Sequence, residues 1–156
     1  MPCCVGEVNM ITKEQLVQEY HDWISQHEWN WIGTLTFRGY PSRKKAQTKF
    51  EQWVSELQKK EGGSKFRYIQ VTETGSYKDN IHFHILIGGL RPSAPKFTGP
   101  WIERWEQLAG DAEIDDYDPD GNYVYYMLKD LKADHDFDIN IRLNPASAEK
   151  LRRKRA

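Results

Sequence analysis

The chain has 156 residues, of which 38% are hydrophobic, 13% aromatic and 29% charged. This composition fits one folded domain and excludes a disordered chain. No run of about 18 apolar residues is present, so the sequence predicts no membrane span. The first residues lack the pattern of a secretory signal, and Cys3 and Cys4 are too few for a disulfide framework. We therefore expect a reducing compartment.

The formal net charge of −1 conceals a strong segregation of charge along the sequence. Residues 111–138 contain ten acidic residues and two lysines, a net charge of −8, whereas the remainder of the chain carries +7. A ligand is steered by the local field rather than by the total charge. A basic face that binds a polyanion is therefore not excluded.

The N-terminal half alternates helices and strands. Residues 1–11 show no periodic pattern and are expected to form an extension of the domain. A helix is predicted to begin after the N-cap residue Thr12, with Gln15 at the capping-box position. Trp29–Phe37 is rich in aromatic and β-branched residues, which predicts a strand. Ser42 is expected to cap a helix over about Lys44–Lys60, which the glycines at positions 62 and 63 end.

Two strands are predicted next, and they form an antiparallel hairpin with a long polar loop. They are followed by a short helix, the acidic run, a tyrosine-rich helix and a last strand. We expect an α+β domain over residues 12–145: an antiparallel sheet of four to five strands, helices mainly on one face, and a basic tail over 146–156. The ranges are Phe66–Thr72 and Ile81–Ile87 for the hairpin, then Trp101–Leu108, Tyr123–Lys132 and Phe137–Leu143.

The strand Ile81–Ile87 contains two histidines, His82 and His84. Side chains at i and i+2 of a strand point to the same face, so both imidazoles project together. Two imidazoles can converge on one divalent ion, although two separately hydrogen-bonded surface histidines would fit the same pattern. The apolar residues on both sides favour the metal site.

A third ligand is expected from the preceding strand, which Glu73 closes. Folding the hairpin brings this carboxylate beside the histidines, and two imidazoles with one carboxylate leave open positions for a substrate oxygen. The sequence does not fix the register of the hairpin, so Thr72 or Thr74 could stand there instead. A solvated carboxylate at a strand end is the alternative for Glu73.

The predicted helix that begins at Tyr123 places Tyr126 and Lys129 at i and i+3, so they are neighbours on one helix face. A tyrosine hydroxyl is a weak nucleophile until a cation helps it to lose its proton, and a lysine one turn away supplies positive charge. Tyr125 is the alternative nucleophile, because it lies at i−4 from the lysine. At least one tyrosine of this helix is expected to belong to the core instead.

These motifs together resemble the HUH endonuclease superfamily, and within it the replication initiators (Rep proteins) of rolling-circle plasmids and small single-stranded-DNA viruses. The resemblance rests on His82-Phe83-His84, on Tyr123-Val124-Tyr125-Tyr126-Met127-Leu128-Lys129, and on the early strand Trp31-Ile32-Gly33-Thr34-Leu35-Thr36-Phe37. The three motifs stand in the order of the family and cover residues 29 to 143. The resemblance implies a central antiparallel sheet of RRM-like topology.

The resemblance also implies the chemistry. Mn²⁺ or Mg²⁺ would be the cofactor, and the reaction would be nicking and joining of single-stranded DNA through a 5′-phosphotyrosine that initiates rolling-circle replication. The implied metal ligands are Glu73, His82 and His84, and the implied catalytic pair is Tyr126 with Lys129. Residues expected to contact DNA are Thr34, Thr36, Arg38, Arg43 and Lys44, although a basic helix face is more often only solvated.

Alternatives remain at this point. The chain could be a transposase or relaxase of the same superfamily, or a non-enzymatic RRM-like nucleic-acid-binding module, although the RNP1 pattern of such modules is missing. The expected partners are single-stranded DNA at an origin stem-loop and a separate or host helicase. The expected location is the cytoplasm of a bacterium or archaeon, or the nucleus of the host of a eukaryotic virus.

Overall fold

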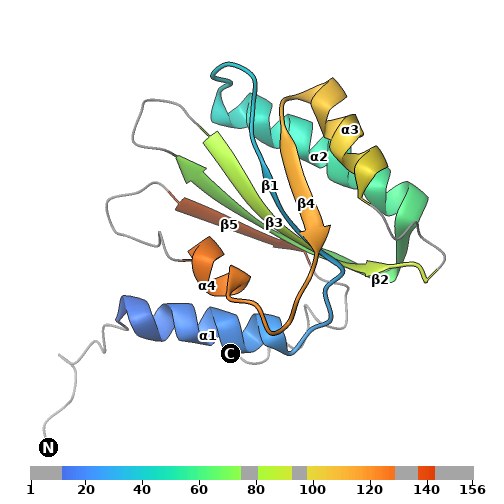
Figure 1. The fold of residues 1–156 in the computed structure, drawn as a ribbon. Helices are drawn as coiled ribbons and strands as arrows, with labels where there is room; N and C mark the ends of the chain where they lie inside the picture. Colours follow the sequence, from blue (N-terminus) through green and yellow to red (C-terminus); the bar gives the residue numbers. More distant parts are fainter. Residues whose placement is uncertain (1–11, 75–80, 93–97, 129–136, 143–156) are drawn as a thin grey trace, which may run out of the picture.

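The computed structural model describes residues 12–74, 81–92, 98–128 and 137–142, with only the backbone described for Lys13, Tyr126 and 137–142. Its elements follow the chain as five strands and four helices within these ranges (Figure 1). Their bounds are α1 Lys13–Ser25, β1 Trp31–Leu35, α2 Arg43–Glu61, β2 Gly62–Thr74, β3 Ile81–Leu90, α3 Gly99–Leu108, β4 Ala112–Asp116, α4 Tyr123–Leu128 and β5 Phe137–Arg142.

The strands form one antiparallel sheet in the order β4-β1-β3-β2-β5, so the histidine strand β3 is central. The predicted α+β class with an antiparallel sheet is thereby confirmed. The expected N-terminal extension and the basic tail lie outside the described residues. None of the described helices is long and apolar enough to cross a bilayer.

The predicted helix starts are confirmed by side-chain caps. The Thr12 hydroxyl accepts a hydrogen bond from the Gln15 backbone N–H, and the Gln15 side chain accepts one from the Thr12 N–H, which completes a capping box. The Ser42 hydroxyl caps α2 by accepting from the Lys45 N–H. Each cap satisfies backbone donors that the first helical turn leaves without an intrahelical partner. Gly62 ends α2 as predicted, but β2 begins directly at that residue.

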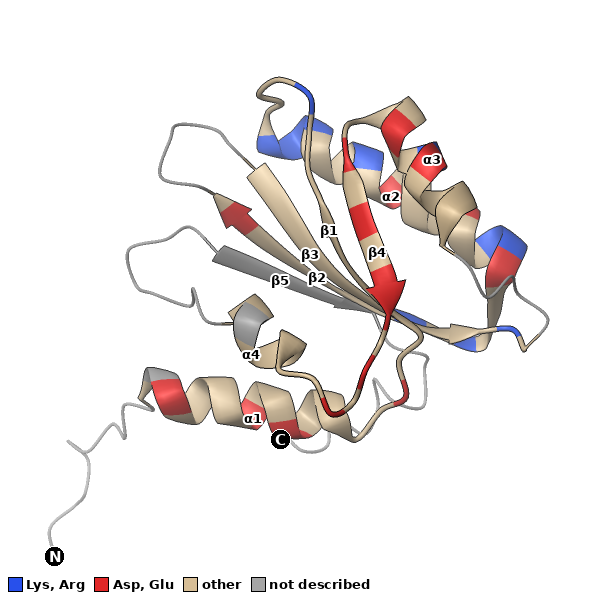
Figure 2. Cartoon of the chain, in the orientation of Figure 1, with Lys and Arg blue, Asp and Glu red and all other residues tan. Residues whose placement is uncertain are grey.

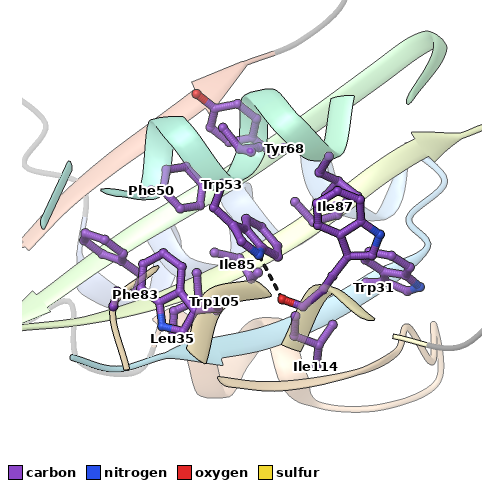
Figure 3. Packing of buried hydrophobic residues seen from close by; sticks show 14 of the residues in the cluster. Trp31, Leu35, Phe50, Trp53, Tyr68, Phe83, Ile85, Ile87, Trp105 and Ile114 are labelled. Atoms are coloured by element: carbon purple, nitrogen blue, oxygen red, sulfur yellow. Dashed lines mark hydrogen bonds between the residues drawn. The ribbon is translucent and has the colours of Figure 1, made fainter. Parts of the chain in front are cut away.

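The first core lies between one face of the sheet and the helices α2 and α3 (Figure 3). Phe83, Ile85 and Ile87 point to this face from β3, because alternate strand residues share a face. Trp53 packs edge-on against Trp105 from the neighbouring helix. The Trp53 indole N–H also donates to the Trp101 carbonyl oxygen at 3.0 Å, so its polar group is satisfied inside the core.

A second core on the opposite face corrects the expectation that helices lie mainly on one face. Leu86 of β3 and Val71 of β2 pack there against Ile24 of α1 and Met127 of α4. Figure 1 shows α1 and α4 on one side of the sheet and α2 and α3 on the other. Strands buried on both faces read as nearly continuous apolar runs, so the pattern of β3 does not reveal which face is covered.

The strand β4 was not predicted, because it lies within the acidic run. It pairs with β1 at the edge of the sheet, where Ile114 is buried opposite Gly33. Its other residues include Glu113, Asp115 and Asp116, all exposed. Charged side chains are a common protection of an edge strand against further pairing. Figure 2 shows the acidic bands along this strand.

Candidate metal and nucleic-acid site

The register of β2 and β3 brings the predicted metal ligands to one face of the sheet. Glu73 is directly opposite His82, and Val71 is opposite His84. Residues opposite one another in an antiparallel pair project to the same side. The two histidines therefore share their face with Leu86 and with Glu73, which is the face that α1 and α4 cover.

Glu73 and His84 are in direct contact. The Nε2 atom of His84 lies 2.8 Å from Oε2 of Glu73, and the His84 side chain is only 8% exposed. An ionised carboxylate can only accept, so Nε2 carries the proton in this hydrogen bond. The contact is the diagonal one between neighbouring strands, which long side chains can span.

Thr34 of β1 holds the other nitrogen of the same ring. It is directly opposite His84 in the β1–β3 register, and its hydroxyl oxygen lies 3.4 Å from Nδ1. In a neutral ring protonated at Nε2, Nδ1 accepts from the threonine hydroxyl. Thr34 was predicted to contact DNA, and the structure places it beside the histidine.

Glu73 and His84 are close enough to ligate one divalent cation together, once the proton on Nε2 is lost. Two neighbouring ligands about 2.1 Å from an octahedrally coordinated ion are roughly 3.0 Å apart, close to the observed 2.8 Å. In the described part of the chain, however, no three His, Cys, Asp or Glu side chains are already arranged around one point. Two donors are thus in contact, and His82 is the third candidate on the same face.

The tyrosines of α4 take different directions. The hydroxyl of Tyr123 donates to the backbone oxygen of Gly33, the residue before Thr34, at 2.6 Å. Tyr125 turns to α1 instead, where its hydroxyl donates to Gln18 at 3.0 Å and its ring stacks on His21 with centroids 4.2 Å apart. Tyr123 therefore reaches the strand that carries Thr34, and Tyr125 does not.

The backbone of α4 places Tyr126 nearer to Tyr123 than to Tyr125 around the helix. Successive residues of an α-helix are about 100° apart, so Tyr126 lies roughly 60° from Tyr123 and 100° from Tyr125. Val124 and Met127 form the buried side of this helix. Lys129 lies outside the described residues.

The residues predicted to bind DNA fall into two groups. The Thr36 hydroxyl donates to the Asp111 carbonyl oxygen, and Arg38 donates to that of Glu106, so both tie the segment after β1 to the α3–β4 region. Arg43 and Lys44 are exposed in the first turn of α2 and line a groove beside the sheet. Figure 2 shows basic residues at this end of α2.

A pair of glutamines that the sequence patterns did not predict lies in that groove. Gln70 of β2 is fully buried and exchanges two amide hydrogen bonds with Gln47 of α2, at 3.0 and 3.1 Å. The signal was a polar residue in a predicted strand, between Ile69 and Val71, which was not singled out.

The fold and this site define an α+β domain that carries a carboxylate–imidazole pair on an antiparallel sheet beside a tyrosine helix. Residues 30–131 match the family of replication-associated proteins ORF2/G2P. Since the match covers most of the sequence, the chain belongs to this family, which confirms the predicted kinship with Rep-type replication initiators. Neither the curated proteins nor the solved structures gave a significant match.

Proposed function

We propose that this protein initiates replication by nicking and rejoining single-stranded DNA through a covalent 5′-phosphotyrosine. Membership of the replication-associated family supports the role in replication initiation. The observation that carries the chemistry is the contact between Glu73 and His84, with His82 on the same face and the tyrosine helix above it. The proposed metal ligands are these three residues, and completing the set needs the His82 side chain to turn toward the pair.

The proposed nucleophile is Tyr126. The phenol oxygen attacks phosphorus, the bond from phosphorus to the 3′ oxygen breaks, and the proton lost from the phenol is balanced by the one that the 3′-hydroxyl gains. A bound Mn²⁺ or Mg²⁺ would supply Lewis-acid polarisation of a phosphate oxygen. Lys129 would add positive charge for the transition state. Because the phosphotyrosine keeps the energy of the phosphodiester, a 3′-hydroxyl can reverse the reaction and join strands.

The choice between the adjacent tyrosines is supported by the contacts of Tyr125. Its ring and hydroxyl are both engaged with α1, away from the strand β1 that carries Thr34. An attacking tyrosine must place its oxygen about 3 Å from phosphorus, so a residue held against α1 would first have to break two contacts. By its position on the α4 backbone, Tyr126 lies nearer to Tyr123 than to Tyr125 around the helix.

The proposed substrate is single-stranded DNA from an origin stem-loop of a plasmid or small virus. The 156-residue sequence contains no GxxxxGK[ST] motif, so strand separation is assigned to a segment outside it or to a separate or host helicase. The basic residues at the start of α2 would contact the phosphate backbone.

The experiment is adduct formation. The protein is incubated with Mn²⁺ and single-stranded oligonucleotides that tile the DNA flanking its own coding region, and covalent protein–DNA complexes are separated on denaturing gels. We expect one oligonucleotide to give an adduct that maps to Tyr126 by mass spectrometry, and Tyr126→Phe to lose it.

Tyr125→Phe is the matched control, since it removes the same atom from the neighbouring residue. It should keep the adduct and lose only the hydrogen bond to Gln18, worth about 1 kcal/mol of stability. Adduct formation that survives Tyr126→Phe and disappears in Tyr125→Phe would reverse the assignment. No adduct under any condition, with the protein folded, would refute covalent nicking.

A further inference from the structure

A groove of about 450 Å³ lies on the face of the sheet opposite the histidines. Its floor comes from β2 and β3, through Gln70, Thr72 and Phe83, and its wall is the first half of α2. Thr72 and Phe83 each adjoin a proposed metal ligand in the sequence, Glu73 and His84 respectively. The groove and the metal pair are therefore at the same end of β2 and β3, on opposite faces.

The floor of the groove carries a buried polar side chain. Gln70 is 0% exposed, and Gln47, half-buried on α2, covers it through the reciprocal pair of amide hydrogen bonds. Such a pair presents one donor and one acceptor side by side, which is the arrangement by which a glutamine amide recognises the N6 and N7 edge of adenine. A base that replaced Gln47 would keep the Gln70 amide satisfied, so its burial would not become unfavourable.

The mouth of the groove is basic. Arg43 and Lys44 line it and are exposed, and no acidic residue stands in the first turn of α2. Glu51 is the one acidic residue among the described lining residues. The groove therefore joins a cationic rim, suited to a phosphate, with an amide-bearing floor, suited to the edge of a base. Its volume falls within the range of sites for small ligands.

We propose that this groove binds one nucleotide of the single-stranded DNA, with its base read by Gln70 and its phosphate held by Lys44 and Arg43. The proposal rests on the proposed function only in taking single-stranded DNA as the ligand. The base enters as the Gln47 side chain moves aside, and adenine is the base that the amide matches best.

The test is a binding selection that needs no cleavage. A randomised single-stranded 20-mer library without metal is bound to the full chain, and the bound fraction is sequenced. We expect the wild type to prefer adenine about tenfold at one position, and Gln70→Leu, which fills the same volume, to lose that preference. Gln47→Ala should keep the preference and bind adenine-containing strands roughly threefold tighter, because no internal partner is displaced.

Two further variants serve as controls. Lys44→Ala should weaken binding of all sequences alike and lower its salt dependence, as expected for a phosphate contact. Gln58→Ala removes an exposed glutamine of the same helix outside the groove and should change nothing. Oligonucleotides with one abasic position separate binding of the base from simple attraction of the phosphate. If the groove only attracts a phosphate, removal of the base will leave the affinity unchanged.

The result of the binding selection does not depend on whether the protein nicks DNA. A library without preference at any position, or a preference that Gln70→Leu keeps, would overturn the groove assignment whether or not adducts form. If Gln70→Leu loses its circular dichroism signal, the affinity change in Gln47→Ala decides alone, and an unchanged affinity counts against the proposal. A clear adenine preference without any adduct would leave the groove standing and remove the proposed catalysis.

Discussion

The imidazole of His84 is held between two strands, with Nε2 at 2.8 Å from the Glu73 carboxylate and Nδ1 at 3.4 Å from the Thr34 hydroxyl. A ring with both nitrogens engaged keeps a fixed orientation without any ligand present. If the ring ligates a metal through Nε2, the Thr34 contact at Nδ1 is the second partner that orients a metal-binding histidine and raises its affinity. These two contacts fix the orientation of His84 between β1 and β2.

Removal of either member of the pair should abolish tight Mn²⁺ binding. We expect His84→Ala and Glu73→Gln each to lower the affinity for Mn²⁺ at least about tenfold, because one of three donors is lost. Titration calorimetry on the protein without DNA measures this effect. His27→Ala is the control and should bind as the wild type, because this histidine follows the end of α1 and packs edge-on against Trp23 and Trp29. Equal affinities in all four proteins would contradict the metal assignment.

Thr34 should act through the orientation of His84 rather than through DNA. Thr34→Val removes the hydroxyl while keeping the β-branched shape, and we expect the Mn²⁺ affinity to fall about tenfold. Thr34→Ser retains a hydroxyl and should restore most of the affinity. A merely structural role would lower the melting temperature of Thr34→Val without changing its metal affinity, and a thermal scan beside the titration distinguishes the two.

The packing of the edge strand β4 on the sheet should depend on one apolar residue. Ile114 is 3% exposed and is the buried contribution of this strand to the first core. Ile114→Ala should therefore lower the free energy of unfolding by about 2–4 kcal/mol, measured by urea denaturation. Glu113→Ala on the exposed side should change it by no more than about 0.5 kcal/mol. A similar small effect for both would mean that the strand is not packed as described.

The ion pair between α2 and α3 should make the stability of the folded protein depend on pH in the acid range. The Arg104 guanidinium donates two hydrogen bonds to the Glu56 carboxylate, at 2.7 and 2.9 Å, and lowers the pKa of that carboxyl from its ordinary 4.5. A lowered pKa in the folded state adds stability above the ordinary value, and this stability is lost as the pH falls through the folded-state pKa.

Glu56→Gln should consequently melt slightly below the wild type at pH 7, and the difference should disappear in strong acid. Thermal scans from pH 7 down to pH 2 measure it. The difference is small because both side chains are about one-third exposed. A gap between the two proteins that widens toward low pH would have the wrong sign for this interaction.

Local patterns in the sequence were sufficient for much of the site. The alternation of β3 placed His82 and His84 on one face, since the period of two is a property of any strand. Capping chemistry was likewise local, so the starts of α1 and α2 followed from Thr12 and Ser42.

The tertiary structure decided what depends on distant partners. The long loop between β2 and β3 left the register open, and burial of alternate residues against two helix layers set Glu73, rather than Thr72 or Thr74, opposite His82. Tertiary packing also covers the second face of the sheet with α1 and α4. It places the acidic segment Ala112–Asp116 beside β1 as a strand, and it pairs Gln47 with Gln70. These features join residues far apart along the chain, and no local period contains that information.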